Sequence, residues 1–180
     1  MLLVALAAAL LGAAPDTPPD PYEPPLPRPM AVETVRDPIT DDLRVQATLR
    51  DQDRRLTLAC DPHDFEFIRV TFTSNRWLVR GNFLTRERAL IYRFDDLRPV
   101  RLIWLVKDRE ARLAGRHRVG EFLRQFIDAD ELVFRTRDVE TNRILLRFRI
   151  VGAREAVDQL LRQCGENEMH DRVFNAPPAE

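Results

Sequence analysis

The sequence predicts an α+β fold, in which a mainly antiparallel β-sheet of sandwich-like or half-barrel form carries two packed α-helices. Two observations lead to this prediction. From Met30 to about Phe94, apolar and polar residues alternate with a period of two, which is typical of strands with one buried face. Within 109–128 and 153–164, apolar residues instead recur at helical spacing.

The first part of the domain is expected to consist of strands. A strand over 30–36 ends at Asp37-Pro38, where turn-forming residues begin. The next strand places Leu43, Val45, Ala47 and Leu49 on one face, because side chains alternate along a strand. Four further strands are expected at 56–60, 65–72, 89–94 and 101–107. The last of these is almost continuously apolar, which predicts a central strand.

The second part is expected to contain both helices and one hairpin. The apolar residues of the first helix are Val119, Phe122, Leu123, Phe126 and Ile127. Strands over 131–137 and 144–150 follow and are joined by the turn DVETN. The last helix has the apolar stripe Ala156, Val157, Leu160 and Leu161, and Gly165 suits its C-terminal end.

The N-terminal residues 1–14 have the length and composition of a signal peptide. Their apolar run is shorter than the ~20 residues that a membrane-spanning helix needs. Small residues from Gly12 to Ala14 offer a cleavage site. We therefore expect an exported protein, periplasmic or secreted, with no stable membrane anchor after cleavage.

Three further segments follow the signal peptide. Residues 15–29 hold eight prolines, and proline fixes φ and removes the amide donor, so this segment is expected to be an extended linker. Residues 30–172 are expected to form a single α+β domain, long enough to bury a core. Residues 173–180 are expected to be a flexible tail.

Composition and motifs argue against nucleic-acid binding and against catalysis. The formal net charge is −1, whereas nonspecific nucleic-acid binding depends on neutralising phosphates. No glycine-rich phosphate loop is present, and the single serine, Ser74, lies in no nucleophile motif. Paired carboxylates could serve a hydrolase, but acidic pairs at strand ends are usually turn formers. They are Asp61 and Asp64, Asp95 and Asp96, and Asp128 and Asp130. We expect neither an enzyme nor a bound cofactor.

The two cysteines are expected to form a disulfide bond. Cys60 lies on the apolar face of its strand, and Cys164 follows Leu160 and Leu161 on the apolar side of the last helix. In an exported protein, two inward-facing cysteines most simply pair with each other. A zinc site is the alternative, with His63 and His170 as further ligands, but its second half has loose spacing. A catalytic thiol would need an exposed, electropositive setting.

Two features are expected to offer a binding surface. In the late hairpin Arg135, Arg137, Arg147 and Arg149 must share the outward face, because the alternate residues are apolar. Arginine suits carboxylate or phosphate partners. Arg76 and Trp77, in a loop after a strand, are residue types that often anchor interfaces.

Several short motifs occur in a definite order along the domain: DPITD at 37–41, LTLAC at 56–60, IYRFDD at 91–96, Trp104, the segment 120–135, and LLRQC at 160–164. On these motifs the chain resembles the VasI/TagO-like family of envelope proteins associated with type VI secretion. The resemblance covers most of residues 32–165, and it departs at 112–120, where the family usually has small residues and proline. It implies an exported, disulfide-bearing, non-enzymatic accessory domain and carries over no catalytic residue.

The sequence thus favours a periplasmic accessory or adaptor protein that binds a protein partner of the envelope. Two alternatives stay open: a small cell-wall hydrolase that uses acidic residues, and a carrier of a small apolar or anionic ligand.

Overall fold

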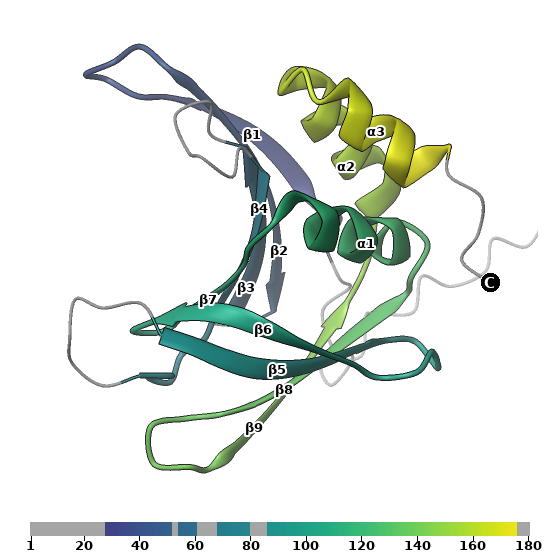
Figure 1. Cartoon of the computed structure of the whole chain (residues 1–180). Coiled ribbons are helices and arrows are strands. Elements are labelled where there is room, and N and C mark those ends of the chain that lie inside the picture. Colours follow the sequence, from purple (N-terminus) through teal and green to yellow (C-terminus); the bar gives the residue numbers. More distant parts are fainter. Residues whose placement is uncertain (1–27, 52–53, 61–67, 80–85, 176–180) are drawn as a thin grey trace, which may run out of the picture.

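The computed structural model describes residues 28–51, 54–60, 68–79 and 86–175 (Figure 1). Within these residues, nine strands form one antiparallel sheet in the order β1-β2-β3-β4-β7-β6-β5-β8-β9, accompanied by three helices. The strands are β1 (Ala31–Arg36), β2 (Leu43–Asp51), β3 (Arg54–Cys60), β4 (Ile68–Thr73), β5 (Arg86–Phe94), β6 (Val100–Lys107), β7 (Glu110–Leu113), β8 (Glu131–Arg137) and β9 (Arg143–Arg149). The helices are α1 (Arg116–Phe126), α2 (Ala153–Gln163) and α3 (Asn167–Phe174). The predicted α+β class with a mainly antiparallel sheet is confirmed.

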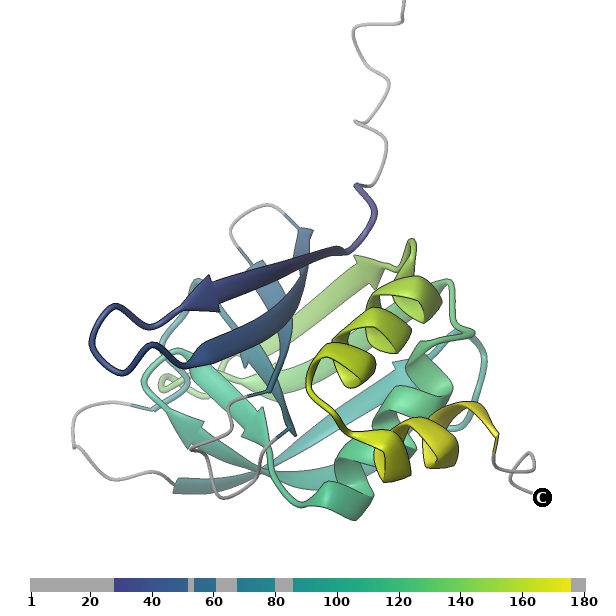
Figure 2. The same cartoon turned by 90° about the horizontal axis from the view of Figure 1, so that it is seen from above.

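The sheet curves around the helices. Figures 1 and 2 show all three helices on its concave side, so that the sheet has the half-barrel form. Its two ends approach each other, because the backbone N–H of Met30, just before β1, donates to the carbonyl oxygen of Val151, just after β9, at 2.9 Å. The concave side is therefore enclosed, and the convex side faces outward.

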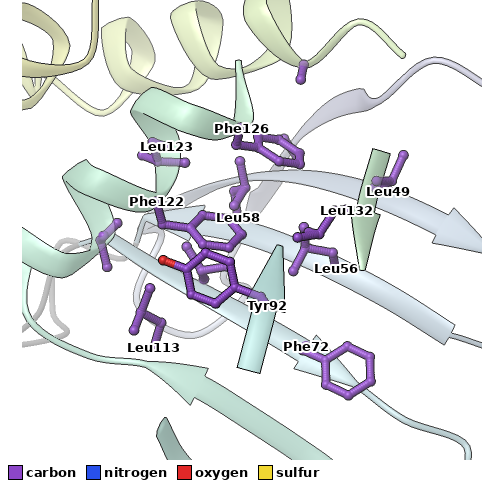
Figure 3. Packing of buried hydrophobic residues seen from close by; sticks show 14 of the residues in the cluster. Leu49, Leu56, Leu58, Phe72, Tyr92, Leu113, Phe122, Leu123, Phe126 and Leu132 are labelled. Carbon is purple, nitrogen blue, oxygen red and sulfur yellow. The ribbon is translucent and has the colours of Figure 1, made fainter. Parts of the chain in front are cut away.

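Aromatic side chains fill the space between the sheet and α1 (Figure 3). The ring of Phe122, from α1, lies with its centroid 5.3 Å from that of Tyr92 and 5.1 Å from that of Phe94. On the sheet, Trp104 packs edge-on against Phe134 at 5.5 Å. Fully burying one such side chain contributes ~1.5–3 kcal/mol. Burial also raises the pKa of Tyr92 to about 12, so its hydroxyl stays protonated. The concave face is the structural core.

Helix α3 was not predicted, and it packs closely on α1. A Cβ atom added at Gly120 would lie only 3.1 Å from the sulfur of Met169 and 3.1 Å from Cδ of Arg172, so a larger residue would require these two side chains of α3 to shift by a few tenths of an ångström. Arg116 also forms an ion pair with the buried Glu166 at the start of α3. The helix has eight residues and buries only two, Met169 and Val173, which is too little for a clear periodic pattern.

Three further strand features differ from the expectation. β7 has only four residues and was missed, yet it joins β4 to β6 in the sheet. β6 is an inner strand, as predicted, but one of its faces is outward, and Ile103 is 44% exposed. Leu43, expected in the core, is 49% exposed. It lies at the start of β2, where the β1–β2 hairpin projects beyond the other strands (Figure 1).

The predicted disulfide bond between Cys60 and Cys164 is present. Their Cα atoms are 6.3 Å apart, within the range of about 4.4–6.8 Å that disulfides need. The bond joins β3 to the end of α2 across a sequence separation of 104 residues. Both sulfur atoms are thus bonded to each other, so neither is available as a zinc ligand. His63 of the alternative zinc site lies outside the described residues, and His170 contacts Asp158 at 2.7 Å.

Several expectations concern residues outside the described part. The signal peptide over 1–14, nearly all of the linker over 15–29 and the start of the strand expected at 65–72 belong here. Of the tail expected over 173–180, residues 173 and 174 belong to α3, and 176–180 are not described. Among the helices that are described, none is long and apolar enough to cross a membrane.

Candidate functional site: an arginine-lined cleft on the convex face

The β8–β9 hairpin presents arginines on the convex face of the sheet. Alternate residues of both strands are buried, and the residues between them point outward. The four arginines predicted to share this face do so, together with a fifth. They are Arg135 and Arg137 of β8 and Arg143, Arg147 and Arg149 of β9, and all are exposed. This side of the hairpin carries far more positive charge than the chain as a whole, whose net charge is −1.

The arginines at one end of the hairpin lie next to a carboxylate of β8, and those at the other end do not. Glu131 pairs with Arg147 at 3.2 Å and lies directly opposite Arg149 in the register of the two strands. At the other end of the hairpin, Arg137 lies opposite Arg143, and no acidic residue stands between them. Like charges opposite each other on a sheet are mildly destabilising. The carboxylates nearest to the end at Arg137 belong to the turn itself, Asp138 and Glu140, and among the described residues no ion pair joins them to Arg137 or Arg143.

A cleft opens at that end because two pairs of strands diverge. β5 pairs with β8 only from Ile91 to Phe94. Its first residues, Arg86–Leu90, lie beside β6 alone among the described strands, and β8 continues beyond Arg135 beside β9. Figure 1 shows the β5–β6 and β8–β9 pairs separating toward the lower left. The resulting cleft has a volume of about 540 Å³. Its lining includes five arginines, Arg88, Arg101, Arg135, Arg137 and Arg143, and the uncharged residues Ala89, Ile91, Thr136 and Thr141.

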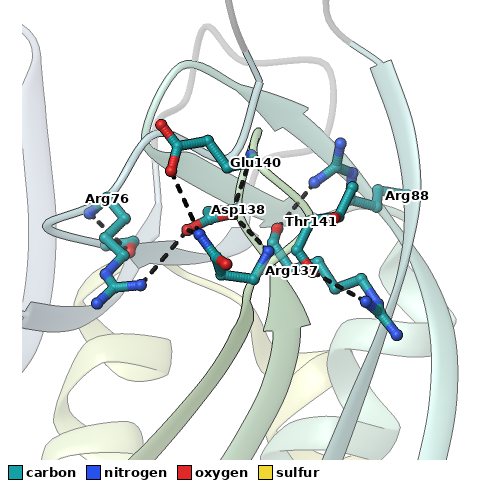
Figure 4. A network of polar contacts seen from close by, with 8 residues as sticks. Arg76, Arg88, Arg137, Asp138, Glu140 and Thr141 are labelled. Atoms are coloured by element: carbon teal, nitrogen blue, oxygen red, sulfur yellow. Dashed lines mark hydrogen bonds and ion pairs between the residues drawn. The ribbon is translucent and has the colours of Figure 1, made fainter.

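Two of the five arginines are held by backbone carbonyl groups (Figure 4). Arg88 donates from Nη1 to the carbonyl oxygen of Arg137 at 2.8 Å, so its side chain bridges the diverging strands. Arg137 in turn donates from Nη1 to the carbonyl oxygen of Thr141 at 2.8 Å. These acceptors are uncharged, so they orient the guanidinium groups without neutralising them. A guanidinium has five N–H donors, and most of them remain for a ligand.

Among the described residues that line the cleft, the one carboxylate is that of Asp138, and it is hydrogen-bonded within the hairpin turn. It accepts hydrogen bonds from the backbone N–H groups of Glu140 at 3.0 Å and Asn142 at 2.8 Å, and from the amide of Asn142 at 3.2 Å. Arg76 adds an ion pair at 3.4 Å. Burial opposes ionisation, but these hydrogen bonds outweigh it and lower the pKa of Asp138. The charge of Asp138 is therefore directed into the turn and toward Arg76.

Thr136 also lines the cleft, but its hydroxyl group is buried. Thr136 is 5% exposed, and its Oγ1 is buried without a hydrogen-bond partner among the described residues. It lies immediately beyond Arg135, the last residue of β8 that pairs with β5. Thr136 belongs to the buried, inward-facing set of β8 together with Leu132 and Phe134, so its hydroxyl is not on the outward face that carries Arg135 and Arg137.

Arg76 and Trp77 lie on a different side of the hairpin turn. Both line a separate hollow of about 470 Å³, together with Asn75 and Val139. The carbonyl oxygen of Trp77 accepts the backbone N–H of Val139 at 3.0 Å, and the guanidinium of Arg109 lies 4.9 Å from the centre of its ring. This loop fastens the hairpin turn to the rest of the domain and does not extend the arginine cleft.

Three arginines of the cleft were not predicted from the sequence: Arg88, Arg101 and Arg143. Arg143 follows the turn of the hairpin and could have been found from the alternation of β9. Arg88 and Arg101 belong to β5 and β6, more than thirty residues earlier in the chain. The register that places Arg101 and Arg135 on either side of Ile91 brings them together, and nothing in the local sequence indicates it.

One carboxylate of each described pair considered for catalysis, and the serine, have structural partners. Asp95 accepts the backbone N–H groups of Asp130 at 3.1 Å and Glu131 at 2.7 Å, as expected of a turn former. Asp128 pairs with Arg154, and the hydroxyl of Ser74 accepts the N–H of Arg76 at 3.0 Å. Asp61 and Asp64 lie outside the described residues. The described part of the chain holds no group of three or more metal-ligating side chains.

Searches against protein-family models, curated proteins and solved structures found no match. The site is therefore interpreted from its own geometry and charge.

Proposed function

We propose that this protein is an exported accessory or adaptor domain of the cell envelope that binds a protein partner through the convex arginine face of β8–β9. The observation that carries the proposal is the set of arginines without a compensating acid. Arg101, Arg135 and Arg143 form no ion pair with any described residue. A chain of net charge −1 that gathers such residues at one end of a hairpin has a surface suited to an acidic partner.

The chemistry of arginine supports an acidic protein partner. Its planar guanidinium matches a carboxylate with two parallel hydrogen bonds, and such charge-assisted bonds are stronger than neutral ones. The exposed arginines contribute little to folding, because exposed ion pairs are worth only ~0–1 kcal/mol. A function in binding therefore explains their grouping better than a function in stability.

Export rests on two observations of different kinds. Residues 1–14 have the character of a signal peptide, and the Cys60–Cys164 disulfide is consistent with an oxidising location outside the cytoplasm. The link to type VI secretion rests on the sequence resemblance. If the leader is removed, the protein isolated from cells should begin between Ala13 and Asp16, as intact mass spectrometry would establish. An intact Met1 would contradict export.

The proposal is tested by removing the charge of the arginine face. The variant Arg135→Gln/Arg137→Gln/Arg147→Gln/Arg149→Gln should keep its thermal stability and lose a partner that the wild-type protein captures from an envelope fraction. The captured complex should also dissociate with rising salt, because exposed charges are screened over about 10 Å at 0.1 M ionic strength.

A matched control variant removes as many charges from the helical side of the molecule. Arg118, Arg154, Arg162 and Arg172 are exposed residues of α1, α2 and α3, and their replacement by glutamine should leave capture unchanged. Equal loss of capture in both variants would mean that net charge alone matters. Unchanged capture in both would contradict the proposal.

A further inference from the structure

We propose that the cleft between β5 and β8 binds an extended, acidic segment of the partner protein, which adds a short strand beside β5 and places its carboxylates among the five arginines. This inference rests on the proposed function and identifies the chemistry of the partner. Three features of the cleft lead to it: an unpaired side of a strand, the spacing of the arginines, and a small, partly polar floor.

The unpaired side of β5 can hydrogen-bond to another strand. From Arg86 to Leu90, β5 is bonded to β6 on one side, whereas its pairing with β8 on the other side begins only at Ile91. An unpaired strand side presents backbone N–H and C=O groups in alternation, which is the template for adding a peptide strand. Among the described residues, the Arg86–Leu90 segment has no strand neighbour on this side.

The arginines are distributed as an extended ligand requires. Arg135 and Arg137 occupy alternate positions of β8, along the direction in which an added strand would run, and Arg101 of β6 and Arg143 of β9 lie to either side of them across the sheet. Neighbouring strands are ~4.8 Å apart, and every second side chain of a strand is ~6.7 Å from the last. A peptide with acidic residues at alternate positions would bring several carboxylates to this surface, whereas one compact anion would reach only part of it.

The floor of the cleft allows a backbone to approach. Ala89 and Ile91 contribute apolar side chains, one of them small, and Thr141 contributes an exposed hydroxyl-bearing side chain. That hydroxyl can donate to a peptide carbonyl or a carboxylate. Arg88, which now donates to the carbonyl oxygen of Arg137, keeps further N–H groups for the ligand.

The mixture of donors and acceptors favours a peptide over an inorganic anion. Phosphate oxygens accept hydrogen bonds, so a phosphate would use the arginines but not the carbonyl groups of the strand side. A peptide strand uses both kinds of backbone group and the arginines together. An acidic peptide is therefore the ligand that can bond both to the arginines and to the free backbone groups of β5.

The test is fluorescence anisotropy with a labelled peptide of about eight residues in which Glu and Val alternate, a length that spans the open part of β5. The purified full-length protein should bind it in a salt-dependent way. The same peptide with alternate backbone amides methylated keeps its charge but cannot form a strand, so it should bind more weakly. A Lys–Val peptide should not bind. Hydrogen exchange should show new protection of the amides of Arg86–Leu90 when the Glu–Val peptide is bound.

Two double variants of β8 and β9 separate the cleft from the rest of the hairpin face. Arg135→Gln/Arg143→Gln removes two cleft arginines that have no partner among the described residues, and should weaken peptide binding about tenfold or more. Arg147→Gln/Arg149→Gln removes the same charge from the end of the hairpin near Glu131, and should change binding far less. Circular dichroism should show both variants folded.

Three outcomes would overturn the inference. Equal weakening by the two double variants would mean that the peptide binds the whole face and not the cleft. Equal affinity of the methylated peptide, or stronger binding of pyrophosphate than of the Glu–Val peptide, would assign the cleft to anions without a strand. If the cellular partner depends on the four arginines while the Glu–Val peptide does not bind, only this inference fails. If the peptide binds the cleft while capture of the partner is independent of the arginines, the proposed function fails alone.

Discussion

The turns of the β1–β2 and β8–β9 hairpins use the same chemistry. In the first, the carboxylate of Asp37 accepts the backbone N–H groups of Ile39 at 2.8 Å and Thr40 at 3.2 Å. In the second, the carboxylate of Asp138 accepts those of Glu140 and Asn142 at 3.0 and 2.8 Å. Each turn also contains one non-glycine residue with positive φ, Asp41 at 62° and Thr141 at 68°. An Asp side chain that accepts local backbone N–H groups is a common way to form a turn.

The two turns differ in what holds them to the domain. Asp138 is 6% exposed and is joined to Arg76, and the next residue, Val139, donates its N–H to Trp77. The β1–β2 turn projects away from the domain (Figure 1), and Ile39 at its tip is 91% exposed. The first hairpin is instead secured midway along its strands, where Cys60 of the disulfide lies opposite Val45 of β2.

Residues close in sequence thus form each turn, whereas contacts with distant residues determine whether the turn is fixed to the domain. The fixed turn is the one next to the arginine cleft, and Arg137 of the cleft donates to a carbonyl group of that same turn. A fastened turn keeps the guanidinium groups oriented before a ligand arrives, which lowers the entropic cost of binding.

The largest expected effect is loss of the disulfide that secures the first hairpin. Cys60→Ala and Cys164→Ala should each lower the free energy of unfolding by up to ~4–5 kcal/mol, because the bond closes a loop of about a hundred residues. The double variant should lose no more than either single variant, since one bond is broken in every case. Chemical denaturation measures these losses, and amide exchange in β1 and β2 should accelerate more than in β8 and β9. Clearly additive losses would indicate independent packing roles and contradict this expectation.

The next effect compares the two aspartates directly. Asp138→Ala leaves the N–H groups of Glu140 and Asn142 without their acceptor in a part-buried setting and releases Arg76, so it should lower the melting temperature clearly. Asp37→Ala removes a similar pair of hydrogen bonds at an exposed tip, where water replaces the carboxylate, and should lower it much less. Thermal unfolding of the two variants checks the difference. Equal losses would show that burial of the second turn does not matter.

Several features of the fold could be predicted because they depend on local pattern. The alternation in β8 and β9 indicated both the buried Phe134 and the outward Arg135, and the inward positions of Cys60 and Cys164 indicated the disulfide. Turn chemistry at Asp37-Pro38 indicated the end of β1. Each of these follows from the spacing of neighbouring residues.

The cleft could not be predicted, because it depends on where two strands stop pairing. Its existence follows from the separation of β5 from β8 beyond Ile91 and Arg135, which is a matter of sheet curvature and register. The ion pair of Asp138 with Arg76 could not be predicted either, because the two residues are 62 positions apart in the sequence. Short elements such as β7 and α3 were missed because too few residues carry their pattern.

A smaller effect is expected on the stability of the protein at acidic pH. The pKa of Asp37 is lowered mainly by the backbone N–H groups of Ile39 and Thr40, and that of Asp138 by the hydrogen bonds from Asn142, Glu140 and Arg76 against an opposing effect of burial. A carboxyl group whose pKa is lower in the folded state stabilises the fold above its unfolded pKa of ~3.9. This stability is lost as the pH falls from about 4 through the lower folded value.

Asp138→Asn should therefore reduce the loss of stability between about pH 4 and pH 2, because asparagine does not titrate. Asp37→Asn should reduce it in the same direction. Urea unfolding at several pH values gives the dependence of the free energy of unfolding on pH for each protein. This dependence should change more in Asp138→Asn than in Asp37→Asn. An unchanged dependence in Asp138→Asn would mean that its carboxylate is not stabilised by the fold.

The smallest expected effect is that of Ile39→Ser at the tip of the first hairpin. Because this side chain is 91% exposed and Asp37 accepts its backbone N–H rather than any side-chain group, the change should alter the free energy of unfolding by no more than ~0.5 kcal/mol. Val139→Ser, at the neighbouring position of the fastened turn, is the matched control and should cost more, because Val139 is partly buried. Chemical denaturation of both variants measures the difference. A clear loss of stability in Ile39→Ser would mean that the tip packs against the domain, and the contrast between a free and a fastened turn would then be wrong.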